Sequence, residues 1–182
     1  LIETPTDHSA FVAKLTAMLT DVAASGPSGS SALLDRAATG SSDATEALRI
    51  VRTRAAEWGY SPDRIGLLGF SAGAFITTRV LANPDRALRP DFAAPIYGGA
   101  FDSSGVPGDL PPMFVVVAQD DQLLAASVIK MVDQLHGAGQ KPAFHLYASG
   151  GHGFGMTKQG KASDHWIDEF YWWMSEKGLL KQ

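Results

Sequence analysis

The chain has 182 residues, of which 45% are hydrophobic, and carries a formal net charge of −4. This length predicts one domain over residues 1–182. Acids and bases are interspersed without the basic stripe that nucleic-acid binding needs, and no apolar run approaches the roughly 18 residues of a membrane helix. We therefore expect neither a nucleic-acid nor a membrane partner, and the absence of cysteine excludes disulfides, a thiol nucleophile and cysteine-ligated zinc.

Residues 1–61 contain two predicted helices but no convincing strand. Residues 7–24 carry apolar side chains on one helical stripe, and residues 42–58 predict a second helix with Ser42 as its N-cap. The Gly, Pro and Ser cluster at 25–31 predicts a loop between them. Leu1-Ile2 is interpreted as the tail of a strand whose body is missing.

The segment Gly69-Phe70-Ser71-Ala72-Gly73 places a serine between two glycines, where a predicted strand (65–68) meets a predicted helix (72–81). This arrangement is typical of a nucleophile elbow, in which a strained turn presents the serine hydroxyl above the sheet. The glycines are expected because Cβ atoms at their positions would collide as the chain doubles back. A plain helix N-cap is the alternative interpretation of Ser71.

Two later segments supply the groups that such a serine needs. The β-branched run 113–118 predicts a strand that leads into Asp120 and Asp121, and a carboxylate there lies at the ligand-binding edge of a parallel sheet. A further strand, 142–148, precedes a glycine-rich loop that holds His152. The three kinds of group therefore converge at one edge, with either aspartate available as the acid.

The other histidines are interpreted as surface or satisfied polar residues, because they lie inside periodic helices or a strand: His8, His136, His145 and His165. No HExxH or comparable ligand pair is present, so we expect no metal site. Either aspartate after 113–118 has a second interpretation, as a cap of the helix that begins near Leu123.

From Ser61 to its end, about two thirds of its length, the chain resembles the α/β-hydrolase esterases of the acetyl-xylan-esterase and feruloyl-esterase-like group, which are themselves similar to dienelactone hydrolases. The resemblance implies a three-layer α/β fold with a mainly parallel sheet, here apparently lacking the N-terminal strands. In the family the acid is usually the second of two aspartates, which implies Asp121 and leaves Asp120 as the alternative; Gln122 stands where proline is common. The motifs that carry the resemblance lie at 61–66, 69–73, 111–114, 120–121 and 150–155.

The resemblance implies an ester hydrolase that needs no cofactor and acts on a small-molecule ester, with an acylated carbohydrate as one candidate. Ser71 would attack the ester carbonyl, His152 would transfer the proton, and Asp121 would orient the imidazole. The backbone N–H of Ala72 would be one of two oxyanion donors. Alternatives on the same fold are a serine peptidase and a dienelactone-type hydrolase, and a further alternative is a non-catalytic remnant.

The second oxyanion donor of this fold comes from a loop after an earlier strand, and no such loop precedes Ser71 here. We therefore expect the 182 residues to be the C-terminal part of a longer chain, or a second chain or homo-oligomer to complete the sheet. No signal peptide is visible; we expect a soluble protein, and a secreted or periplasmic location stays open if the N-terminus is missing.

Two further segments have simple interpretations. Residues 164–177 carry aromatic side chains at helical spacing, which predicts a core-packing stripe rather than a substrate platform. The run 92–96 predicts a strand, and the Tyr97-Gly98-Gly99-Ala100-Phe101 segment after it is either part of the pocket or a plain turn.

Overall fold

The computed structural model describes residues 27–101 and 105–180, with side chains from residue 39 onward. It separates into two units, Leu1–Thr39 and Gly40–Gln182. The sheet and every site residue predicted above belong to the second unit.

Four strands form one parallel sheet in which each strand pairs with the next along the chain. They agree with the predicted strands to within two residues at each end. Every residue of the third strand is buried, which explains why its sequence is an unbroken apolar run rather than an alternating one. The strands, in chain and sheet order, are β1 (Gly66–Phe70), β2 (Phe92–Ile96), β3 (Phe114–Ala118) and β4 (Ala143–Tyr147).

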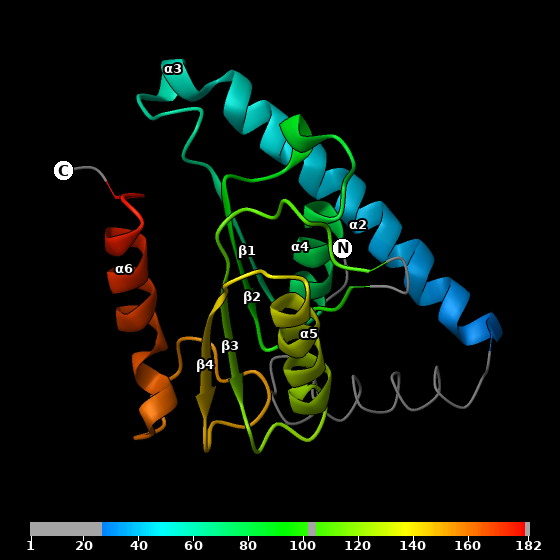
Figure 1. The fold of residues 1–182 in the computed structure, drawn as a ribbon, viewed down its shortest axis with the longest axis vertical. Coiled ribbons are helices and arrows are strands. Elements are labelled where there is room, and N and C mark those ends of the chain that lie inside the picture. Colours follow the sequence, from blue (N-terminus) through cyan, green and yellow to red (C-terminus); the bar gives the residue numbers. More distant parts are fainter. Residues whose placement is uncertain (1–26, 102–104, 181–182) are drawn as a thin grey trace. The chain divides into compact units, whose positions relative to one another are not determined.

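Helices cover both faces of this sheet, which gives the three layers that the resemblance implied (Figure 1). Helices α4 (Ala72–Leu81) and α5 (Ala125–Gly137) lie on one face, and α6 (Trp166–Glu176) lies on the other. Two short 3-10 turns, η1 (Arg86–Leu88) and η2 (Ala162–His165), complete the elements of this unit after β1. None of the described helices is long and apolar enough to cross a membrane.

The aromatic stripe of α6 packs into the core, as predicted. Trp166, Phe170 and Trp173 are buried, and the rings of Phe170 and Trp173 lie 5.1 and 5.6 Å from that of Phe114 on β3. The opposite side of the helix leaves Trp172 61% exposed. The helical spacing of the aromatic residues therefore fixes which face of α6 meets the sheet.

Before the sheet, the chain forms α2 (Pro27–Thr53) and α3 (Ala55–Trp58), and no described residue ahead of β1 is in a strand. The predicted loop at 25–31 is therefore wrong over its described part, 27–31, which is helical. Proline is tolerated in the first helical turn, where its missing N–H costs no hydrogen bond, and the penalty of single Ser and Gly residues is small.

Ser42, the predicted N-cap, lies in the interior of α2 and is therefore not at a helix start. The predicted helix 7–24, Leu1-Ile2 and His8 lie outside the described residues.

The C-terminal part of α2 is fixed to the start of the sheet. Leu48 forms a small apolar cluster with Ile65 and Val80. Arg52 donates to the carbonyl of Arg89 at 2.9 Å and to both carboxylate oxygens of Asp91 at 3.2 Å. One oxygen of Asp91 also accepts the N–H of Ile65 at 2.8 Å, so the residues that lead into β1 and β2 are held together.

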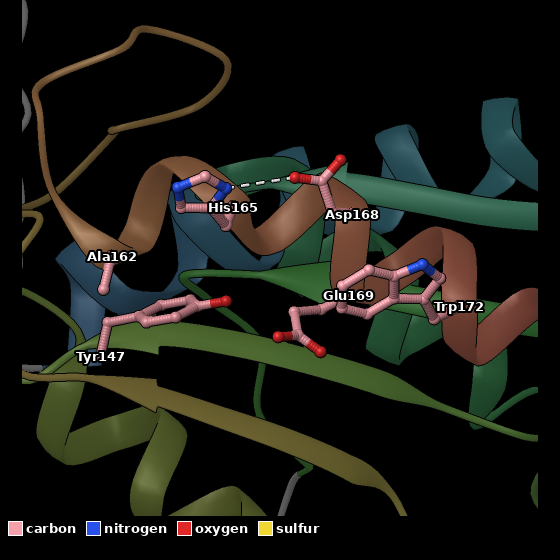
Figure 2. Close-up of a pocket in the computed structure, with 6 residues that line it drawn as sticks. All are labelled: Tyr147, Ala162, His165, Asp168, Glu169 and Trp172. Atoms are coloured by element: carbon pink, nitrogen blue, oxygen red, sulfur yellow. Dashed lines mark hydrogen bonds and ion pairs between the residues drawn. The ribbon is translucent and has the colours of Figure 1, made fainter.

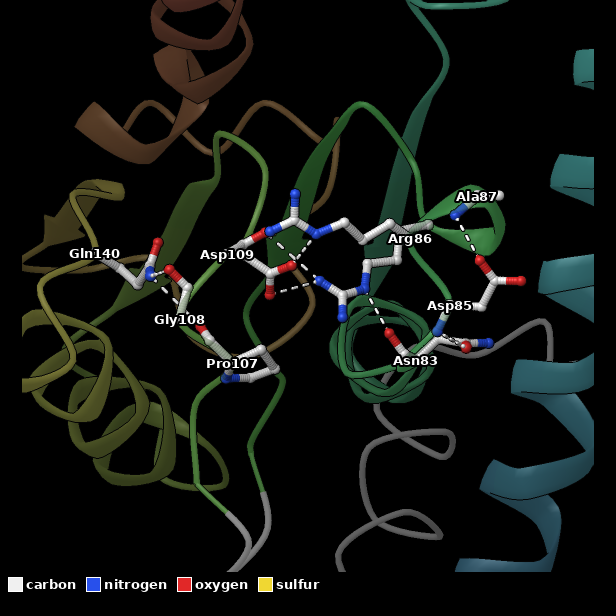
Figure 3. A network of polar contacts seen from close by, with 9 residues as sticks. Asn83, Asp85, Arg86, Ala87, Pro107, Gly108, Asp109 and Gln140 are labelled. Carbon is white, nitrogen blue, oxygen red and sulfur yellow. Dashed lines mark hydrogen bonds and ion pairs between the residues drawn. The ribbon is translucent and has the colours of Figure 1, made fainter.

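A polar network holds the loop between β2 and β3 against the end of α4 (Figure 3). The guanidinium of Arg89 is buried, donates to the carbonyl of Asn83 at 2.5 Å and pairs with Asp109 at 3.0 Å. Arg86 pairs with the same carboxylate. The hydrogen bond from Arg89 is the main cause that lowers the pKa of Asp109 below its usual value. Gln140, beyond α5, donates to the carbonyl of Gly108 at 3.0 Å.

Candidate active site

Ser71 occupies the sharp turn between β1 and α4, with φ 51° and ψ −114°. Among the described non-glycine residues only Tyr97 also has a positive φ. Such a conformation costs on the order of 1–3 kcal/mol and persists only where surrounding contacts enforce it. The Ser71 N–H donates to Ile96 at 3.0 Å, and a Cβ at Gly98 would lie 2.5 Å from the Ser71 carbonyl oxygen. The turn thus has the backbone expected of a nucleophile elbow, and Ser71 does not act as a side-chain cap.

Asp121 follows β3 by a tight turn, and its side chain is fully buried. Its N–H donates to the carbonyl of Ala118 at 3.1 Å. Its Oδ1 accepts the N–H groups of Leu123 at 2.9 Å and Leu124 at 3.1 Å, which lie in the turn before α5, whereas the helix itself begins at Ala125 with Leu124 as its N-cap. Because these donors occupy Oδ1, the other oxygen, Oδ2, is left to face the imidazole of His152.

The imidazole of His152 lies between Ser71 and Asp121 and contacts both side chains. Its Nδ1 lies 2.8 Å from Asp121 Oδ2, and its Nε2 lies 2.9 Å from Ser71 Oγ. An ionised carboxylate can only accept, so Nδ1 carries the proton in the neutral imidazole and Nε2 is free to accept from the serine hydroxyl. The imidazole side chain is only 5% exposed. The chain therefore brings three predicted site residues, from segments far apart in sequence, into one hydrogen-bonded row.

Asp120, the alternative acid, faces elsewhere. Its Oδ1 accepts the backbone N–H groups of Gly150 at 2.9 Å and Gly151 at 2.7 Å. Ala72, the predicted oxyanion donor, is the first residue of α4, where N–H groups have no acceptor within the helix. Its N–H follows Ser71 directly in the chain and lies at the positive end of the helix.

The ring of Tyr97 packs against the imidazole and is itself part of an aromatic cluster. The ring of Tyr97 meets that of His152 edge-on at 5.3 Å and that of Phe154 at 4.8 Å. Burial raises the pKa of Tyr97 to about 12, outweighing the opposing effect of a hydrogen bond with the Gly155 backbone. Phe70, 39% exposed, lies 5.7 Å from the Tyr97 ring. The sequence indicated that Tyr97 could line the pocket, but nothing in it indicated contact with His152, because that contact joins residues 55 positions apart in the chain.

A cavity of about 330 Å³ lies apart from this row, between the end of β4 and the start of α6 (Figure 2). Tyr147 and Trp172 contribute aromatic walls, and the Tyr147 hydroxyl is buried without a hydrogen-bond partner among the described residues. At the rim of the cavity, the Nδ1 atom of His165 lies 3.2 Å from Asp168 Oδ2. Of the predicted site residues, none lines this cavity.

The residues that the structure describes include no group of three or more His, Cys, Asp or Glu side chains placed to hold a metal ion. His145 lies on β4 with its ring 4.7 Å from that of Phe114, and partial burial lowers its pKa. His136 is exposed at the end of α5, and His165 is exposed beside Asp168. His136 and His165 have the surface positions predicted for them, whereas His145 is partly buried and packs against an aromatic ring.

An acetylxylan esterase from Xylanibacter ruminicola is 24% identical over 165 residues, which cover 72% of this chain and 34% of that protein. The chain thus spans about a third of the length of this curated relative.

Two solved structures share the fold. MGS-M1, an α/β hydrolase enzyme from a Medee basin deep-sea metagenome library, is 26% identical, with a TM-score of 0.63 over 75% of this chain and 63% of that one. An acetyl ester-xyloside bifunctional hydrolase from Caldicellulosiruptor lactoaceticus is 23% identical, with a TM-score of 0.65 over 78% and 66% of the two chains. A model of the dienelactone hydrolase family matches residues 17–176. Since that match covers most of the sequence and agrees with the fold, the chain belongs to the dienelactone hydrolase family.

Proposed function

We propose that this protein is a serine carboxylic ester hydrolase in which Ser71, His152 and Asp121 form the catalytic triad. The observation that carries the proposal is the continuous row from Ser71 Oγ through both imidazole nitrogens to Asp121 Oδ2, with heavy-atom distances of 2.9 and 2.8 Å. Both distances are within the range in which a proton is passed between side chains. The strained backbone of Ser71 supports the same interpretation.

In the first half of the reaction, Ser71 Oγ attacks the ester carbonyl carbon while its proton moves to His152 Nε2. The tetrahedral intermediate collapses, its bond to the alcohol oxygen breaks, and the imidazolium gives the proton to the departing alcohol. A water then attacks the acyl-serine while the same nitrogen takes its proton. The bond between Ser71 Oγ and the acyl carbon breaks, the imidazolium returns the proton to Oγ, and the acid leaves. Asp121 Oδ2 stabilises the imidazolium through Nδ1–H in both halves.

The negative oxygen of the tetrahedral intermediate requires donors that are already in place. The Ala72 N–H is suited to this role, because it belongs to the first turn of α4 and lies at the positive end of the helix. A second donor is expected in this fold, and its absence would lower turnover by about 10² to 10³. We therefore expect slow but measurable turnover if the 182 residues supply one donor only.

The relatives support one substrate class. One is named an acetylxylan esterase and another an acetyl ester-xyloside bifunctional hydrolase, which supports short acyl groups on a carbohydrate as the substrate. A dienelactone-type lactone or a peptide would use the same triad, so these stay as alternatives on the same fold. A panel of acetylated xylo-oligosaccharide, lactone and peptide substrates separates them, because only hydrolysis of the first releases acetate.

Labelling with a fluorophosphonate tests the triad without knowledge of the substrate, because the probe reacts with an activated serine. We expect one label per chain on Ser71, its loss in Ser71→Ala, and a fall in turnover of a short-chain p-nitrophenyl ester of about 10⁴- to 10⁶-fold. Ser127→Ala, in α5, is the matched control and should leave both unchanged. A parent chain that neither labels nor hydrolyses any ester would favour the non-catalytic alternative instead.

A further inference from the structure

The loop that carries His152 has little regular backbone structure of its own. Gly151 and Gly153, on either side of the histidine, have φ of 69° and 77°, which glycine adopts at low cost. A loop with this freedom in its backbone does not by itself fix the direction of the imidazole. Since Nε2 must reach Ser71 while Nδ1 reaches Asp121, another contact has to set the position of the loop.

Asp120 makes that contact. Two consecutive N–H groups, those of Gly150 and Gly151, converge on a single carboxylate oxygen at 2.9 and 2.7 Å. Bonds from N–H groups to an ionised carboxylate are stronger than those between neutral groups. They end immediately before His152, so any shift of the Gly151 peptide moves the imidazole with it.

Other contacts limit where this peptide can lie. A Cβ at Gly150 would come within 3.0 Å of the Ala118 side chain at the end of β3, so the loop packs closely on the strand that leads to Asp120. Gln159 donates to the Gly150 carbonyl at 3.2 Å. The N–H of Gly150 and its carbonyl are thus both bonded to side chains, and the N–H bond goes to the residue next to Asp121.

We propose that Asp120 is a positioning residue: it fixes the backbone of the His152 loop, while the adjacent Asp121 orients the imidazole. Asp120 touches neither the imidazole nor the serine through a hydrogen bond of its own and acts through the peptide groups of Gly150 and Gly151. This inference rests on the proposed function, because the loop that Asp120 positions carries the histidine of the proposed triad, to which only Asp121 belongs. It also gives a physical reason for two carboxylates at the end of β3.

Three variants test the proposal with steady-state kinetics on a p-nitrophenyl ester. In Asp120→Ala both bonds are lost, and we expect kcat to fall about 10- to 100-fold, with KM changed much less, because a misplaced base slows the proton transfer rather than substrate binding. Asp120→Asn keeps an acceptor oxygen at the same place and should restore kcat to within about threefold of the parent. Asp85→Ala removes a carboxylate that accepts the N–H of Ala87 in a different loop, and it should leave kcat unchanged.

A readout without turnover separates failure of this proposal from failure of the proposed function. Nuclear magnetic resonance follows exchange of the Gly150 and Gly151 amide protons and the Nδ1–H signal of His152. We expect faster exchange and a lost or broadened Nδ1–H signal in Asp120→Ala, but parental behaviour in Asp120→Asn and Asp85→Ala. An unchanged exchange rate and signal in Asp120→Ala would overturn the positioning role, and so would parental kcat in an active protein. A parent chain without ester turnover or labelling would instead reject the proposed function.

Discussion

At the scale of single residues, the two oxygens of Asp121 have different partners, and this difference decides what a substitution does. Oδ1 is occupied by the N–H groups of Leu123 and Leu124, which can only donate. Oδ2 alone meets His152 Nδ1. A side chain of the same shape must therefore keep an acceptor on the Leu123 side and place its other atom against the imidazole.

Asp121→Asn should consequently lower kcat by about 10⁴-fold. Its amide oxygen will accept from Leu123 and Leu124, so its NH₂ group will face Nδ1 and donate to it. That forces the proton onto Nε2, which then cannot accept from the Ser71 hydroxyl. The measurement is kcat on a p-nitrophenyl ester together with the thermal midpoint, which should change little because the shape is conserved. Turnover within tenfold of the parent would mean that Asp121 is not the acid of the triad.

At the scale of elements, the turn from β1 to α4 depends on one glycine of the GxSxG segment more than on the other. A Cβ at Gly69 would lie 2.2 Å from the carbonyl oxygen of Gly73 and 2.5 Å from the Thr77 hydroxyl oxygen. A Cβ at Gly73 would meet nothing within 4 Å. The expectation that both glycines avoid collisions is therefore wrong for Gly73: its backbone lies against Gly69, but its own Cβ position in the first turn of α4 is open.

Alanine substitutions at Gly69 and Gly73 test this difference, and the second serves as the control for the first. Gly69→Ala should destabilise the fold by about 1–3 kcal/mol or more, because backbone atoms of α4 must move, and it should displace Ser71 and reduce fluorophosphonate labelling. Gly73→Ala should leave stability unchanged or slightly raised, since alanine is the better helix former. Chemical denaturation of both variants measures the free energy of unfolding, and fluorophosphonate labelling of the folded protein measures the reactivity of Ser71. Equal stability of the two variants would contradict the close approach at Gly69.

Elements with a strong local pattern could be predicted from the sequence, and those set by tertiary context could not. β2 and β3 are buried apolar runs, β1 and β4 are mainly apolar segments that stay partly exposed, and the α6 stripe repeats at helical spacing, so local sequence was sufficient for them. The start of α2 was missed because serine, glycine and proline favour loops locally, and the interruption at Arg54 carries no sequence signal. Ser71 and His152 followed from glycine spacing, whereas the separate contacts of Asp120 and Asp121 depend on side-chain directions that spacing does not specify.

At the scale of the whole molecule, the apolar strand β1 lies at one edge of the sheet and β4 lies at the other. In the order β1-β2-β3-β4, β1 pairs with β2, and no described segment pairs with its other side. Leu68 and Phe70 on this strand are 37% and 39% exposed, so β1 leaves apolar side chains in contact with solvent. Natural proteins protect such edges with charges, proline or a covering element, because unpaired N–H and C=O groups recruit other strands.

We therefore expect the 182-residue chain to self-associate as its concentration rises, through the open side of β1. Leu68→Lys should shift sedimentation toward the monomer, because a lysine on an edge strand disfavours pairing with another chain and its charge remains in solvent. Ile129→Lys is the matched control, since Ile129 is 41% exposed on α5, away from this edge, and the substitution should not change the association. Sedimentation velocity over a wide concentration range measures all three proteins. A parent chain that is monomeric throughout, or equal effects of the two lysines, would show that β1 is already covered.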